Sequence, residues 1–122
     1  MENMKNITVE LNNKIPLSKF TFTQDLIAYC RIGKDYSKWK LEITVYPDKY
    51  MPDYDLLEEY IYSLNGSVGT REEIVSDIYE YIYSQLKPKR LIIVSRDDMS
   101  SYSNLELVID SDDVNETGAV AL

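Results

Sequence analysis

Residues 39–46 alternate between apolar and polar side chains, Trp-Lys-Leu-Glu-Ile-Thr-Val-Tyr, and this pattern constrains the fold more than any other in the chain. A period of two residues is typical of a strand with one buried face. Pro47 follows directly and removes a backbone donor that a longer strand would need. The chain is therefore expected to build a sheet with one apolar face, which other elements must cover.

Two helices are predicted after this strand. Asp53 is expected to cap the first helix, whose apolar residues recur at helical spacing until Gly66 ends it. Thr70 and Glu73 are spaced as a capping box at the start of the second helix. The apolar stripe of that helix runs until Pro88, which a helix cannot easily accommodate.

Three further strands are predicted over residues 26–32, 90–95 and 104–110. Residues 90–95 are apolar and β-branched, and residues 104–110 alternate between apolar and polar side chains. Together with residues 39–46 they give the order strand, strand, helix, helix, strand, strand. We expect an α+β protein with one antiparallel sheet and two helices on one face. Because the outer strands of such a sheet carry unpaired backbone groups, an oligomer that closes the edges is also expected.

The 122 residues are expected to form one domain with two flanking segments. Residues 1–25 are interpreted as a lead-in with short strands, and residues 26–110 as the folded domain. Residues 111–122 are acidic and then rich in small side chains, which predicts a flexible tail.

The composition argues against several classes of function. The chain has 13 basic and 21 acidic residues, a net charge of −8, which disfavours direct binding to nucleic acid. It has no histidine, so a His-based triad within one chain is excluded and no metal site is expected. No apolar stretch is long enough to cross a membrane, and no signal peptide is recognised. One cysteine cannot form an internal disulfide, so a reducing, cytoplasmic location is expected.

Three points along residues 26–110 carry a resemblance to a known family. Cys30 lies at the end of the first strand, and sixteen residues separate it from Pro47, which is followed by Asp48. Asp53 opens the first helix, and Arg71-Glu72 opens the second. In these points, and in its order of strands and helices, the chain resembles the QueF family of 7-cyano-7-deazaguanine reductases and their QueF-like relatives. The resemblance implies the tunnelling fold (T-fold), in which subunits join their sheets into an oligomeric barrel with sites at the subunit interfaces.

The resemblance also implies a chemistry for two of these residues. Cys30 would attack the nitrile carbon of 7-cyano-7-deazaguanine and form a covalent thioimide, for which a thiolate is required. Glu72 stands where the family has its site Glu and would pair with the N–H edge of the 7-deazaguanine base. The ordinary alternatives are a small buried cysteine and a first-turn acid that stabilises its helix.

The chain departs from the family pattern at two positions. The family has a catalytic Asp seven residues after the nucleophile, where this chain has Ser37, and Asp35 in the same loop is the candidate to replace it. Arg71 stands where the family has a histidine, and with Asp53 it is a further candidate for substrate binding. The alternatives are a solvated loop residue for Asp35, a surface arginine for Arg71 and a helix cap for Asp53.

A third departure concerns the cofactor. The reductases carry a motif of the form Glu-Ser-Lys-Ser-Leu-Lys that resembles an NADPH-binding element, whereas the stretch from Asp53 reads Asp-Tyr-Asp-Leu-Leu-Glu. No cofactor is therefore expected. In this respect the chain resembles the shorter QueF-like amidinotransferases, which add ammonia to the nitrile of a tRNA-borne base, although the net charge of −8 disfavours tRNA.

Three functions thus remain open. The leading interpretation is amidine formation on a 7-deazaguanine substrate through a thioimide on Cys30. The first alternative is NADPH-dependent reduction to the 7-aminomethyl base, with cofactor phosphates held by residues such as Lys34, Lys38, Lys40 or Arg71. The second alternative is a non-catalytic T-fold protein that binds a purine-like ligand.

Overall fold

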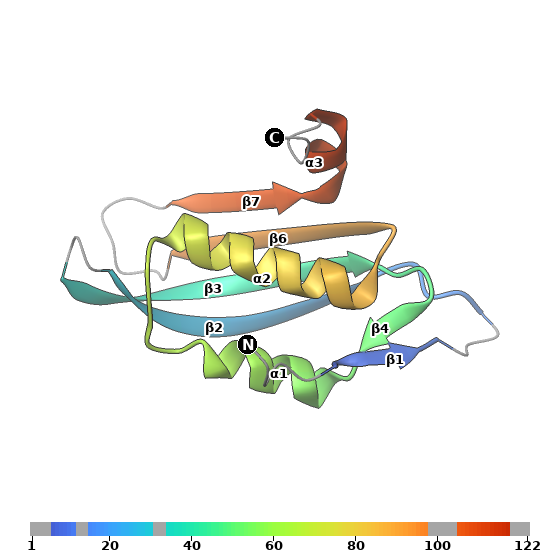
Figure 1. Cartoon of the computed structure of the whole chain (residues 1–122), viewed down its shortest axis with the longest axis horizontal. Coiled ribbons are helices and arrows are strands. Elements are labelled where there is room, and N and C mark those ends of the chain that lie inside the picture. The colour runs from blue at the N-terminus through green and yellow to red at the C-terminus, as the bar shows by residue number, and fades with distance from the viewer. Residues whose placement is uncertain (1–5, 12–14, 31–33, 98–104, 118–122) are drawn as a thin grey trace.

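The computed structural model describes residues 6–11, 15–30, 34–97 and 105–117 (Figure 1). Within these ranges, the side chains of Cys30 and of residues 115–117 lie outside the description.

A five-stranded sheet forms the centre of the molecule, in the order β5-β2-β3-β6-β7. Figure 1 labels β2, β3, β6 and β7 of this sheet. Its strands are β2 (Phe20–Cys30), β3 (Asp35–Tyr46), β5 (Ser67–Val68), β6 (Arg90–Asp97) and β7 (Glu106–Asp110). Neighbouring strands are antiparallel, except that β5 runs parallel to the end of β2. A separate two-stranded ribbon pairs β1 (Thr8–Glu10) with β4 (Tyr50–Pro52).

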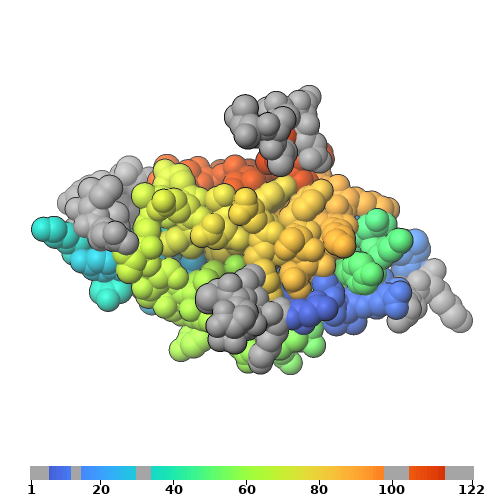
Figure 2. All heavy atoms as spheres, viewed as in Figure 1, coloured from blue at the N-terminus to red at the C-terminus, as the bar shows by residue number. Residues whose placement is uncertain are grey.

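Two helices, α1 (Tyr54–Ser63) and α2 (Arg71–Leu86), cover one face of the sheet (Figure 1). They hide most of that face in the space-filling view (Figure 2). The predicted caps are confirmed: Asp53 accepts hydrogen bonds from two backbone N–H groups of α1, and Thr70 forms a capping box with Glu73. The architecture is therefore α+β with two helices on one face, as the sequence pattern predicts.

The core lies between this sheet face and the helices. The apolar residues of the alternating stretch, Trp39, Leu41, Ile43 and Val45, are at most 2% exposed. Ile43 lies opposite Ile93 of β6, which is also fully buried. Because burial of each such side chain stabilises the folded state by about 1.5–3 kcal/mol, the alternation explains which face receives the helices.

The opposite face of the sheet is charged. Arg96 in β6 donates hydrogen bonds to Glu42 in β3 (2.6 Å) and to Glu106 in β7 (2.8 Å), so one guanidinium bridges three strands. These side chains are largely exposed, so the pairs add little to stability.

The sheet extends further than the sequence pattern predicts. Strand β2 begins at Phe20 rather than at residue 26, so part of the predicted lead-in belongs to the central sheet. Strand β3 begins at Asp35 rather than at residue 39, and Asp35 is therefore a strand residue instead of a loop residue. Both extensions arise because β2 and β3 pair without interruption from Phe20–Val45 to Cys30–Asp35. The sequence pattern of one strand, by contrast, identifies only the part in which apolar and polar residues alternate most clearly.

The first seven residues of the segment interpreted as a flexible tail are helical. Helix α3 (Ser111–Thr117) follows β7 directly. Ser111 is 1% exposed, and its Oγ accepts a hydrogen bond of 2.9 Å from the backbone N–H of Leu91. This tertiary contact ties the segment to the sheet, and its local composition carries no sign of it.

Candidate active site

The end of β2 and the start of α2 are joined by backbone pairing. The N–H of Gly66 donates to the carbonyl of Ile27 (2.8 Å), and that of Gly69 donates to the carbonyl of Tyr29 (3.3 Å). The side chain of Asn65 accepts from the N–H of Ile27 at 2.9 Å. Gly66 adopts a φ of 84°, a left-handed conformation that glycine reaches without strain. This connection brings the first residues of α2 next to the end of β2, where Cys30 lies.

Cys30 and Asp35 lie opposite each other at the ends of two paired strands. They are register partners across β2 and β3, which sets their Cα atoms about 4.5–5.5 Å apart. Asp35 is exposed, and its Oδ1 accepts a hydrogen bond of 2.7 Å from the N–H of Tyr36. Asp35 is thus a direct cross-strand neighbour of the candidate nucleophile.

Ser37, which stands at the family's aspartate position, is the register partner of Ala28 rather than of Cys30. Its Oγ accepts a hydrogen bond of 2.8 Å from Nε1 of Trp39. The hydroxyl therefore holds the buried indole ring in place, which is a structural use of that position.

Glu72 occupies the first turn of α2 and is exposed. The adjacent capping interactions are made by Thr70 and Glu73, so Glu72 is not required for them. A carboxylate at this position is stabilised by the partial positive charge of the helix N-terminus. The side chain is therefore available to a ligand at the same end of the sheet as Cys30.

Arg71 is held against the sheet. Its Nη2 donates a hydrogen bond to Oδ1 of Asp97, and its guanidinium lies 4.9 Å from the centre of the Trp39 ring. The hydrogen bond from Arg71 lowers the pKa of Asp97 below its ordinary value. Only 13% of the Arg71 side chain and 16% of the Asp97 side chain are exposed, so Arg71 is not a freely solvated surface arginine.

Asp53 lies at the other end of the subunit. Its N–H donates to the carbonyl of Ile7, and its Oδ1 accepts from the N–H groups of Asp55 and Leu56 at 3.0 and 3.1 Å. Helix α1 has ten residues and spans about 15 Å, and its C-terminal end leads to β5, which pairs with the end of β2. Within one subunit, Asp53 is thus a helix cap that the structure does not bring together with the other candidates.

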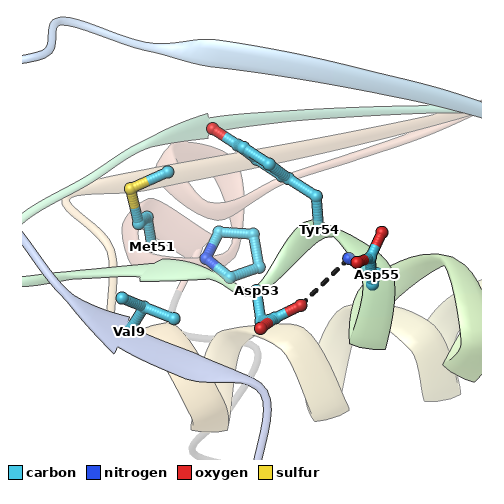
Figure 3. A pocket seen from close by; sticks show the side chains of 6 residues that line it. Val9, Met51, Asp53, Tyr54 and Asp55 are labelled. Atoms are coloured by element: carbon cyan, nitrogen blue, oxygen red, sulfur yellow. Dashed lines mark hydrogen bonds between the residues drawn. The ribbon is translucent and has the colours of Figure 1, made fainter.

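An open cavity of about 340 Å³ lies beside Asp53 (Figure 3). It is lined by Val9, Met51, Pro52, Asp53, Tyr54 and Asp55. The sequence of α1 contains acidic residues and no lysine or arginine. A cofactor phosphate here would lie beside the carboxylates of Asp53 and Asp55 with no cation on α1 to offset them. Asp53 already accepts from the N–H groups of Asp55 and Leu56, so the start of α1 does not fit the phosphates of NADPH.

Two of the lysines considered for a cofactor, Lys38 and Lys40, face a carboxylate of the same subunit. Lys38 and Lys40 lie 3.6 and 3.9 Å from the carboxylate of Asp25 on the charged face of the sheet.

Within the described ranges, no three His, Cys, Asp or Glu side chains form a group that could hold a metal ion. No helix among the described residues has the length and apolar character needed to cross a membrane.

Three residues at this end of the sheet were missed by sequence reasoning: Asn65, Trp39 and Asp97. The sequence predicts Trp39 only as an apolar strand residue, and Asp97 lies beyond the predicted strand of residues 90–95. Asp97 ends β6 as the register partner of Trp39, and both contact Arg71. An aspartate directly after a buried strand was the available signal, but its partner lies 26 residues away in the sequence.

Comparison with solved structures defines the class of fold. A crystal structure of an archaeosine synthase QueF-Like in the apo form superposes with a TM-score of 0.70 at 15% identity, covering 77% of this chain and 93% of that one. A putative dihydroneopterin aldolase (FolB) from Vibrio cholerae O1 biovar El Tor str. N16961 gives a TM-score of 0.55 at 12% identity, covering 79% and 98%. The chain is a T-fold protein.

No family model matches the sequence. The NADPH-dependent 7-cyano-7-deazaguanine reductase of a Nitratiruptor species is 31% identical over 78 residues, which are 64% of this chain. The match spans 56% of the length of that relative. Together with the T-fold, this similarity confirms the resemblance to the QueF and QueF-like family.

Proposed function

We propose that the protein is a 7-deazaguanine-processing enzyme that binds the nitrile of 7-cyano-7-deazaguanine covalently through Cys30. The observation that carries the proposal is the pairing of β2 with β5 and β3, which gathers Cys30, Asp35 and Glu72 at one end of the sheet. The sequence similarity to a 7-cyano-7-deazaguanine reductase supports the same substrate class.

In the first step, the sulfur of Cys30 forms a bond to the nitrile carbon, and one π bond of the nitrile breaks. The thiol proton ends on the nitrile nitrogen, so the product is a neutral thioimide. Asp35, as the cross-strand neighbour of Cys30, is the group that we propose carries this proton.

Recognition of the base is assigned to Glu72. Its exposed carboxylate can accept two parallel N–H hydrogen bonds from the edge of a deazaguanine, which is a specific and charge-assisted contact. Arg71, which immediately precedes Glu72 on the helix, is committed to Asp97 and Trp39 and is not needed as a direct substrate contact.

For the second step, amidine formation is favoured. Ammonia adds to the thioimide carbon, the sulfur leaves as the thiol, and the nitrile has become an amidine. The reason is the acidic start of α1, which does not fit a cofactor phosphate. The alternative, reduction to the 7-aminomethyl base, is favoured by the similarity to the Nitratiruptor protein, which is an NADPH-dependent 7-cyano-7-deazaguanine reductase.

We further propose that the protein works as a homo-oligomer in a reducing, cytoplasmic compartment. The β7 edge and most of the β2 edge carry unpaired backbone groups in the described subunit, and neighbouring copies could pair with them. Sites at the resulting interfaces would be completed by residues of an adjacent copy. The net charge of −8 favours a free base over a nucleic acid as the substrate.

The test is intact-protein mass spectrometry after incubation with 7-cyano-7-deazaguanine, with Cys30→Ala as the control. We expect one adduct of the mass of the ligand, absent in the variant. A folded, oligomeric protein without an adduct would instead support the non-catalytic purine-binding alternative.

The second substrate is identified in a separate assay. With ammonia, the proposal predicts an amidine product and no absorbance change from NADPH. Oxidation of NADPH that depends on 7-cyano-7-deazaguanine would contradict amidine formation and establish the reductase.

A further inference from the structure

We propose that Asp97 and Trp39 are positioning residues that set the place of Glu72 by anchoring Arg71. The inference rests on the proposed function, because Glu72 is the group assigned there to the base. It adds two residues of the central sheet to the determinants of ligand binding.

Both anchoring contacts come from one rung of the sheet. Trp39 of β3 and Asp97 of β6 are register partners, and both side chains contact the guanidinium of Arg71. Arg71 also donates to the backbone carbonyl of Leu105 at 3.4 Å. The first residue of α2 is therefore attached to β3, β6 and the segment before β7.

Trp39 and Asp97, which together form the anchor of Arg71, are themselves held by hydrogen bonds. Nε1 of Trp39 donates to Ser37, and the ring is 2% exposed. Oδ2 of Asp97 accepts from the N–H of Leu105 at 2.8 Å, so both carboxylate oxygens are used. The Arg71 side chain is 13% exposed, against 38% for Arg90 in the ion pair with Asp110. A less exposed pair with several fixed partners is more strongly restrained than an ordinary surface pair.

The consequence for Glu72 follows from helix geometry. Glu72 is the next residue, so fixing the Arg71 side chain on the sheet fixes the rotation of the first turn and the direction in which Glu72 leaves it. The capping box of Thr70 and Glu73 keeps this turn helical without the anchor. Loss of the anchor should thus displace or loosen the first turn rather than unfold it.

A guanidinium stays protonated at all physiological pH values, so Arg71 cannot exchange protons as a histidine could. Its contacts instead fit a mechanical role.

The matched test compares two isosteric variants in the full-length protein. Asp97→Asn removes the charge that holds Arg71, and Asp110→Asn removes one of the two carboxylates that pair with Arg90 at the opposite end of β6.

Two readouts are measured for each variant. The first is amide hydrogen exchange of Glu73 and Ile74, whose N–H groups close the first turn of α2. The second is the Kd for 7-cyano-7-deazaguanine in the Cys30→Ala background, where no covalent bond forms. We expect Asp97→Asn to speed exchange at these amides and to raise the Kd about tenfold, as for a lost charged hydrogen bond. Asp97→Glu should recover most of the affinity, and Asp110→Asn should change neither readout.

The inference is overturned if Asp97→Asn matches the unmodified protein in exchange, or if Asp110→Asn has the same effect, which would indicate a general loss of stability. Failure of the proposed function has a different signature. In that case the unmodified protein does not bind 7-cyano-7-deazaguanine, while the exchange rates still report whether Asp97 anchors the first turn of α2.

Discussion

Cys30 ends β2, Asp35 begins β3, and the two residues are direct cross-strand partners. The pairing places the backbone of an exposed carboxylate residue beside that of the only cysteine of the chain. A general base must lie within hydrogen-bond reach of the proton that it moves, and this register makes such a contact attainable.

Asp35→Asn should slow formation of the Cys30 adduct about 100-fold, because proton transfer by a positioned group contributes at least this factor. The measurement is the time course of the adduct by intact-protein mass spectrometry. Asp25→Asn is the matched control, since Asp25 is an exposed β2 carboxylate that pairs with Lys38 and Lys40. Equal rates for Asp35→Asn and the unmodified protein would remove Asp35 from the mechanism.

Glu72→Gln should weaken binding of 7-cyano-7-deazaguanine about tenfold or more, because an amide provides only one acceptor where the carboxylate provides two. Calorimetric titration in the Cys30→Ala background isolates this effect from the covalent step. Glu80→Gln changes an exposed glutamate further along the same helix and should leave the Kd unchanged. If both variants bind like the unmodified protein, Glu72 does not contact the base.

The Arg71–Asp97 pair should make stability depend on acid pH. The hydrogen bond from Arg71 lowers the pKa of Asp97 in the folded state below its ordinary value of 3.8. The contribution of the pair is therefore complete above that value and is lost as the pH falls through the lower, folded-state pKa. Urea unfolding at pH 7 and at pH 2–3 should show a smaller acid-induced loss of free energy for Asp97→Asn than for the unmodified protein. An identical loss would mean that the pair does not contribute.

Ile43→Ala should lower the free energy of unfolding by about 2–5 kcal/mol, because it leaves a cavity at a fully buried position between the sheet and the helices. Urea denaturation monitored by circular dichroism measures this change. Ile15→Ala serves as the control, since Ile15 is 81% exposed and should shift the value by no more than about 0.5 kcal/mol. Similar losses for the two variants would contradict the assignment of the core.

Much of the fold was predictable from local patterns. The alternation around Ile43 identifies the buried face of β3, and Thr70 with Glu73 marks the start of α2. These signals are strong because periodicity and capping depend on neighbouring residues alone. The extension of β2 to Phe20 and the helix from Ser111 were missed, because each depends on a partner strand far away in the sequence.

The sequence by itself determined the order of strands and helices, the apolar face of the sheet and the caps of both helices. It also identified Cys30, the one cysteine of the chain, as the candidate nucleophile. Only the tertiary structure decided which candidates come together. It aligns Cys30 with Asp35, brings Glu72 to the same end and leaves Asp53 about one helix length away. The physical reason is that hydrogen-bond register and helix docking are long-range contacts. Asp97 and Trp39 lie 58 residues apart in the chain and yet form one rung beneath Arg71.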